Sequence, residues 1–212
     1  MENLDVITER IRLSFESRTA ARDHALSQAR MLTRHCANAI RAIHRNERMH
    51  AEEHLQSARE ISEAIHHELR GYPDLYYTGY TQDALKEYAE ANTVFAMVHD
   101  EPLPDPETLG LEPSTYLLGL AESAGELRRR CLDILRHGHS EEAERLLSCM
   151  DDIYAVLVTM DYPDAITGGL RRLTDIVRGI NERTRGDMTI SIRQAHLEQN
   201  IKNLEERLDN QT

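Results

Sequence analysis

The chain has 212 residues and a formal net charge of −12 at pH 7. That length allows one well-buried domain or two small ones, and the charge argues against a protein that coats nucleic acid with its whole surface. Cys36, Cys131 and Cys149 form no C-x-x-C pair, which argues against a disulfide scaffold or a thiolate zinc site. We expect a cytoplasmic protein, because no apolar run approaches the roughly 20 residues that span a bilayer and the N-terminus does not resemble a signal peptide.

The chain reads as helical along nearly its whole length. Apolar residues recur at helical spacing, and only 6 prolines and 10 glycines are present. We therefore predict an all-α fold, a single domain over residues 1–212 that forms a bundle of seven helices. The fourth helix is expected to begin after Pro113 and to stop at Gly138. The others span residues 2–46, 48–70, 81–98, 140–160, 165–185 and 186–208.

The last expected helix has apolar residues close to a 3.5-residue period. This pattern suits a helix–helix seam, either within one subunit or between subunits. Its members are Ile190, Leu197, Ile201, Leu204 and Leu208.

An acidic stripe marks the expected helix over residues 81–98. At 100° per residue, Asp83, Glu87 and Glu90 fall within an arc of about 60°, beside an apolar arc through Ala84 and Tyr88. Like charges at this spacing repel by roughly 0.2–0.5 kcal/mol for each exposed pair. The stripe is therefore costly unless a cation or a basic partner offsets the repulsion.

A second acidic pair, Glu122 and Glu126, follows about thirty residues later, beside Gly119 and Gly125. Small residues at these positions would let another helix approach closely. Two helices that each carry a carboxylate pair could meet around one hard cation, because Mg²⁺ and Mn²⁺ prefer oxygen ligands. The alternative is that each pair is a solvated helix face, which is common in a chain that is 29% charged.

Positive charge is concentrated near the N-terminus. Residues 17–46 contain one acid, Asp23, and six arginines: Arg18, Arg22, Arg30, Arg34, Arg41 and Arg45. The planar guanidinium fork suits bidentate contacts with phosphate, so this segment is a candidate nucleic-acid track. The excess of 23 arginines over 2 lysines in the whole chain has an alternative origin in genomic base composition, but the clustering needs a further reason.

Two further patterns lie in the first half of the chain. The Glu-x-x-His pairs Glu47…His50 and Glu63…His66 are typical of di-iron carboxylate bundles, yet they lie 16 residues apart on one expected helix, about 24 Å along its axis. They cannot share a centre. The tyrosine-rich residues 72–80 are interpreted as aromatic packing at a helix junction, with base stacking as the alternative.

Two blocks of the sequence resemble the translin family. The first is E-Y-x-E-A at residues 87–91, and the second is Y-L-L-G-x-A-[DE]-x-x-G-E-L at residues 116–127, with a turn-rich loop between them. The chain is most similar to the translin-associated factor X branch, and in particular to its archaeal members. The resemblance extends over nearly the whole chain, although only these two blocks are specific.

The resemblance implies an all-helical subunit that assembles into a homo-oligomeric, octamer-like shell around single-stranded RNA. It also implies an endoribonuclease that depends on Mg²⁺ or Mn²⁺, held by Glu87, Glu90, Glu122 and Glu126. The branch usually has Asp at the position of Glu122, so the side chain is one methylene longer here, which bears on the geometry of the site. Asp83 is not assigned to a position of the family pattern and is kept as a candidate acid just outside the metal ligands.

Such a site would activate water and neutralise charge on the scissile phosphate, or one carboxylate would act as general base. The arginines of residues 18–45 would hold phosphates without reading sequence. Arg129 would contact phosphate or pair with Glu126 or Asp133. Two alternative functions remain: a translin-like protein that binds single-stranded RNA or DNA without cleavage, and a helical scaffold whose acids are only surface.

Overall fold

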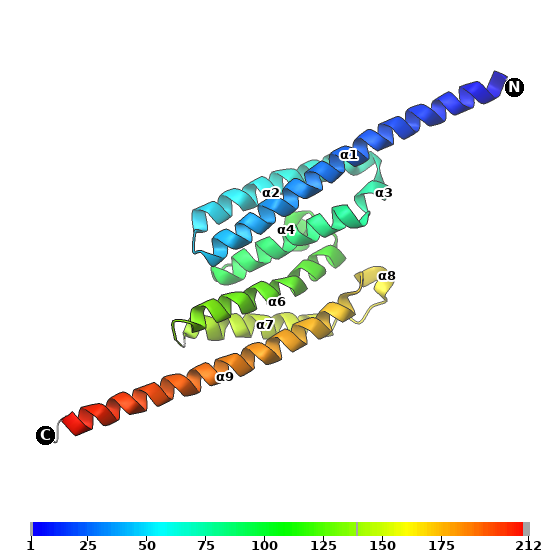
Figure 1. Ribbon diagram of the computed structural model, residues 1–212. Coiled ribbons are helices and arrows are strands. Elements are labelled where there is room, and N and C mark those ends of the chain that lie inside the picture. Colours follow the sequence, from blue (N-terminus) through cyan, green and yellow to red (C-terminus); the bar gives the residue numbers. More distant parts are fainter. Residues whose placement is uncertain (1, 139, 210–212) are drawn as a thin grey trace. The chain divides into compact units, whose positions relative to one another are not determined.

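The computed structural model describes residues 2–138 and 140–209, and it confirms the all-α prediction (Figure 1). Over these residues the chain forms helices α1 to α9 and one short 3-10 helix, without a strand. The described residues divide into two compact units, one with residues up to Phe95 and Leu103–Gly119, the other with Ala96–Pro102 and the residues from Leu120 onward. The single domain over residues 1–212 stays a prediction. No described helix is long and apolar enough to cross a membrane.

The first unit is built on a hairpin of α1 (Glu2–His44) and α2 (Arg48–Glu68). Asn46, the expected stop, lies in the turn between them with φ 59°, a left-handed conformation that asparagine tolerates better than most residues. The inner face of α1 is apolar and fully covered at Leu32 and Cys36. Burial of this stripe accounts for the long helix, because an amphipathic helix is stabilised mainly by tertiary packing.

The rest of the first unit connects this hairpin to a central helix. Three short helices lie in or next to segments predicted to be irregular: η1 (Leu69–Gly71), α3 (Pro73–Tyr76) and α5 (Pro106–Leu109). The long helix between them is α4 (Gly79–Val98). Within α4, Leu85, Ala89 and Val94 are completely buried. This helix is therefore part of the core, and its charged residues must lie at the edge of that core.

Helix α6 (Pro113–Leu135) begins in the first unit and continues into the second. The second unit also contains α7 (Glu141–Val158), α8 (Asp164–Thr167) and α9 (Leu170–Asp209). A buried amide joins α9 to α7, because Asn181 donates a hydrogen bond to the carbonyl of Met150 at 2.8 Å. Arg128 joins α6 to α9 through the Thr184 hydroxyl at 3.0 Å.

The predicted helix boundary at Gly186 is wrong. Helix α9 runs without a break through this residue, because a single glycine costs only about 1 kcal/mol in a helix interior. The chain breaks earlier, at Gly168 and Gly169, which have φ values of 63° and 87°. Positive φ is readily adopted only by glycine, so this pair ends α8 and lets α9 start at Leu170.

Two helix ends extend beyond the other helices of their own units (Figure 1). In the N-terminal part of α1, Ile11 and Phe15 are exposed, and every member of the predicted seam on α9 is exposed as well, from Ile190 at 65% to Ile201 at 47%. The described residues of one chain do not cover this seam. A seam within one subunit is therefore not found among the described residues, and a seam between subunits remains as the predicted role.

Candidate functional site

The acidic stripe lies where α4 leaves the core. Glu90 is buried at 8% exposure, Glu87 is half-buried, and Asp83, one turn earlier, is exposed. Ala84 and Tyr88 on the same helix are buried at 2%. The expected placement of the acids beside the apolar arc is therefore confirmed, and the depth of the carboxylates increases from Asp83 to Glu90.

Helix α6 reaches α4 at a glycine. A Cβ atom added to Gly119 would lie 2.6 Å from the Cβ of Ala89, 2.6 Å from the carbonyl oxygen of Lys86 and 2.9 Å from the amide nitrogen of Glu90. Separations below about 3.0 Å do not occur for real Cβ atoms, and two of these three neighbours are backbone atoms that cannot rotate away. A side chain at position 119 would therefore push the two helices apart.

No neighbouring helix of the described residues comes this close to α6 at Gly125. A Cβ atom added there would meet no described atom within 4 Å. The expectation that both glycines admit a neighbouring helix is thus confirmed for Gly119 and wrong for Gly125. The two glycines of α6 therefore differ: Gly119 is required by close helix packing, whereas Gly125 occupies a position with room for a side chain.

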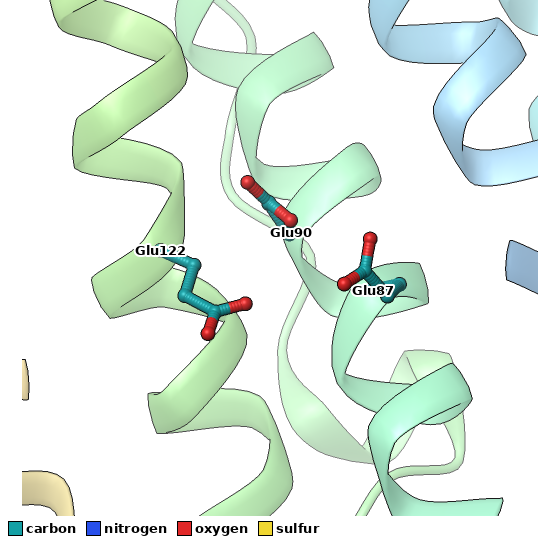
Figure 2. A group of neighbouring side chains, drawn as sticks. All are labelled: Glu87, Glu90 and Glu122. Atoms are coloured by element: carbon teal, nitrogen blue, oxygen red, sulfur yellow. The ribbon is translucent and has the colours of Figure 1, made fainter. Parts of the chain in front are cut away.

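Glu122 lies three residues beyond Gly119, less than one turn along the same helix, and is half-buried. Figure 2 shows its carboxylate turned toward those of Glu87 and Glu90. One oxygen of each of the three carboxylates lies within 4.8 Å of the others. We call Glu87, Glu90 and Glu122 the glutamate cluster.

The donor set of the glutamate cluster fits a hard divalent cation. Carboxylate oxygens are the ligands that Mg²⁺ and Mn²⁺ prefer, with Mg²⁺–oxygen distances of about 2.0–2.1 Å, so two neighbouring ligand oxygens lie about 3 Å apart. Rotation of flexible glutamate side chains can close the present separations to that value. Two ionised carboxylates about 5 Å apart repel by on the order of 3 kcal/mol at an effective dielectric constant of about 20, and a cation between them replaces this repulsion with attraction.

The negative charge of the α4 glutamates affects a buried thiol of the first unit, that of Cys36. The pKa of the Cys36 thiol is raised above its ordinary range, first by burial and then by the negative charges of Glu87 and Glu90. Cys36 is completely covered. It therefore stays a neutral thiol behind the acids and is not a thiolate ligand.

Glu126, the fourth predicted acid, does not belong to the glutamate cluster. It lies one turn beyond Glu122 on α6, and its carboxylate is 3.8 Å from the Arg129 guanidinium. Of the two roles considered for Arg129, the structure contains the ion pair with Glu126. A shift of one helical turn, about 5.4–6 Å along the axis, separates this acid from the three that converge.

A cavity of about 370 Å³ lies between α1 and α4, beside the cluster. Arg30 lines it from α1, and Asp83 and Glu87 line it from α4. Tyr80 also lines it, and its buried hydroxyl has no described hydrogen-bond partner. Sequence reasoning did not single out Tyr80, because a tyrosine within a tyrosine-rich connection carries no signal of its own.

The six arginines of residues 17–46 are all exposed, but they occupy two faces. Arg30, Arg34, Arg41 and Arg45 fall within an arc of about 60°, whereas Arg18 and Arg22 are rotated by at least about 80° from it. We call the four residues on one face the arginine face: Arg30, Arg34, Arg41 and Arg45. None of its members forms an ion pair with a carboxylate in the described part of the chain.

The other two arginines of residues 17–46, Arg18 and Arg22, have acidic partners. Arg18 bonds to Asp74 and stacks over the ring of Tyr72, with 5.9 Å between guanidinium and ring centroid. Arg22 pairs with Asp23 at 3.0 Å. They are less available to phosphate than the arginine face.

The competing sequence patterns fall elsewhere in the first unit. Glu47 lies 3.7 Å from His50, while Glu63 pairs with Arg59 at 2.9 Å and His66 contacts the Tyr76 hydroxyl at 3.3 Å. The ring of Tyr76 is buried against His66 and Tyr77. This supports aromatic packing at the helix junction.

Comparison with known proteins gives a consistent picture. The model of the Translin family matches residues 18–208. An uncharacterized protein of Methanocaldococcus jannaschii is 32% identical over 192 residues, which is 89% of this chain and 84% of that protein.

Solved structures agree with the sequence relatives. The crystal structure of AfC3PO has a TM-score of 0.81 and 33% identity, over 89% of this chain and 98% of that one. A complex of AfC3PO with duplex RNA gives a TM-score of 0.82, 33% identity and coverages of 89% and 97%. Apo-NeC3PO, at 20% identity, a TM-score of 0.80 and coverages of 86% and 96%, shares the fold.

Proposed function

Because the chain belongs to the Translin family, we propose that it is a metal-dependent endoribonuclease that acts on single-stranded RNA as a homo-oligomer. The observation that carries the proposal is the glutamate cluster, whose carboxylate oxygens lie within 4.8 Å of one another. A related solved structure, AfC3PO, forms a complex with duplex RNA, which supports RNA as the ligand. Single-stranded DNA is a second candidate ligand.

Each acid has a distinct part in the proposed reaction. Glu87, Glu90 and Glu122 hold Mg²⁺ or Mn²⁺, and Glu90, the most buried of them, has the least freedom to move. When bound, the cation supplies positive charge beside the scissile phosphate and lowers the pKa of water. To Glu126, one turn away on α6 and 3.8 Å from the Arg129 guanidinium, we assign the role of accepting a proton from the attacking water.

The RNA path follows the arginine face to the cavity between α1 and α4. Arg30 belongs to both, since it lies on that face and lines the cavity together with Glu87. Arginine contacts with phosphate hold a backbone without reading bases. They also explain how a chain of net charge −12 binds RNA, because the positive charge is local.

The assembly rests on the exposed apolar ends of α1 and α9. Five large apolar side chains of the α9 seam are between 47% and 65% exposed, which is unfavourable in a monomer and typical of a surface that binds a second copy. We propose that this seam is covered by another subunit in an octamer-like shell.

Substitution of the acids separates metal binding from proton transfer. Glu87→Gln, Glu90→Gln and Glu122→Gln should each lower kcat by about 100-fold or more and raise the Mn²⁺ concentration needed for half-maximal cleavage, since each removes a charged ligand. Glu126→Gln should lower kcat without changing the metal requirement. The measurement is cleavage of labelled single-stranded RNA across a Mn²⁺ series, with chelator and with duplex RNA as comparisons.

Glu53→Gln, at an exposed acid of α2, is the matched control and should behave as the unmodified protein. Glu122→Asp restores the residue usual in the related branch and should retain activity. If RNA binds but no chelator-sensitive cleavage occurs, the proposed nuclease activity is rejected and the protein is a binding protein without cleavage.

Neutralising the arginine face should weaken RNA binding in a salt-dependent manner. The variant Arg30→Ala/Arg34→Ala/Arg45→Ala should lose at least tenfold in affinity near 0.1 M salt, and the slope of log K against log salt should fall by about 2, because each single-strand phosphate contact contributes about 0.7. Fluorescence anisotropy with labelled RNA measures both quantities. Arg70→Ala, at an exposed arginine of the 3-10 helix η1, serves as the control. An equal loss of affinity in Arg70→Ala would contradict the assignment of RNA binding to the arginine face.

Disrupting the α9 seam should reduce the molar mass in solution. Sedimentation velocity of the unmodified protein should give a particle near eight times the chain mass of 24.3 kDa, and Ile201→Glu/Leu204→Glu should give smaller species because charge is placed on the buried seam. Gln199→Glu, on the outer side of the seam, should leave the assembly intact. A monomeric unmodified protein would reject the shell.

A further inference from the structure

Two histidines face each other across the α1–α2 hairpin. The Nδ1 atom of His35 on α1 lies 3.3 Å from the Nδ1 atom of His54 on α2, and the ring centroids are 5.3 Å apart in an edge-on arrangement. Both side chains are half-buried, so they are held by packing yet reachable from solvent. The pair lies in the first unit and shares no residue with the glutamate cluster.

We propose that His35 and His54 bind a borderline divalent transition metal, with Zn²⁺ the preferred ion, and that this ion links α1 to α2. A tetrahedral zinc site with Zn–N distances of about 2.0–2.1 Å places two ligand nitrogens about 3.3–3.4 Å apart, which matches the observed separation. Imidazole suits Zn²⁺, Cu²⁺ and Ni²⁺, whereas carboxylates suit Mg²⁺ and Mn²⁺. The chain thus has two sites of different chemical preference.

The surroundings leave both rings available as ligands. No other described side chain forms a hydrogen bond or an ion pair with His35 or His54, so neither ring is held by a carboxylate. Burial, followed by the nearby His54 and Arg34, lowers the pKa of the His35 imidazole below its ordinary value. A neutral imidazole is the form that coordinates metal.

Another histidine on the same helix seam has a different partner. His24 lies 2.9 Å from the carboxylate of Glu68, so an acid occupies the position beside its ring nitrogen. The His35–His54 pair has no such acid, and two protonated rings at 3.3 Å would repel each other. The observed geometry is compatible with two arrangements: a metal ion bound by both rings, or one hydrogen bond between two neutral rings. A measurement of metal binding distinguishes them.

Zinc binding to the purified full chain tests the proposal. Isothermal titration with Zn²⁺ is carried out in excess Mg²⁺, which occupies the carboxylates. We expect one zinc site per chain, and His35→Gln and His54→Gln should each weaken it by at least tenfold. The double variant should lose little more than either single variant, because one remaining imidazole is a poor ligand set. His67→Ala, an exposed histidine of α2, is the matched control and should bind zinc unchanged.

Titration of the unmodified protein with Co²⁺ keeps the test independent of variant folding. The paramagnetic ion should shift the ring-proton NMR signals of two histidines, one of which should be absent from the spectrum of His35→Gln and the other from the spectrum of His54→Gln. Zinc affinity that is the same in His35→Gln and His54→Gln as in the unmodified chain would overturn the proposal. So would the absence of any zinc-dependent change in the unmodified chain.

Discussion

The close approach of α6 to α4 at Gly119 is the contact on which the candidate site depends. Backbone atoms of Lys86 and Glu90 occupy the space that a side chain at position 119 would need. Because Glu122 follows Gly119 by less than one turn, this single contact sets how near its carboxylate comes to those of Glu87 and Glu90. The chemistry of the site is therefore controlled by a residue that has no side chain.

Charge is divided between the core edge and the solvent-facing side of the first unit. The α4 acids increase in burial from Asp83 to Glu90, and burial makes their mutual repulsion stronger and their attraction for a cation greater. The arginine face lies on the opposite side of α1 from its buried stripe, where long side chains remain hydrated and free to meet phosphate. The cavity lined by Arg30 and Glu87 is the place where these two regions meet.

The sequence predicted the helices well where apolar periodicity was strong, and it placed Asn46 correctly at the first turn. It failed at Gly186, because a lone glycine does not end a helix, whereas Gly168 and Gly169 adopt positive φ together. The resemblance named four acids, and three of them have ligand oxygens within 4.8 Å of one another. Which acids come that close depends on helix packing that spacing does not specify. A simple helical projection of the sequence could have predicted the division of the arginines into two faces. The His35–His54 contact was not, because it requires the register between α1 and α2.

The dependence of metal binding on the α6–α4 contact is tested by comparing Mn²⁺ binding to Gly119→Ala and to Gly125→Ala, followed by the electron paramagnetic resonance signal of the free ion. Both substitutions raise helix propensity by about 1 kcal/mol, and only the first introduces a methyl group that meets α4. We expect Gly125→Ala to bind Mn²⁺ as the unmodified protein does, and Gly119→Ala, with its helical content retained by circular dichroism, to bind at least tenfold more weakly. Equal Mn²⁺ affinity in the two variants, or no Mn²⁺ binding by the unmodified chain, would contradict this dependence.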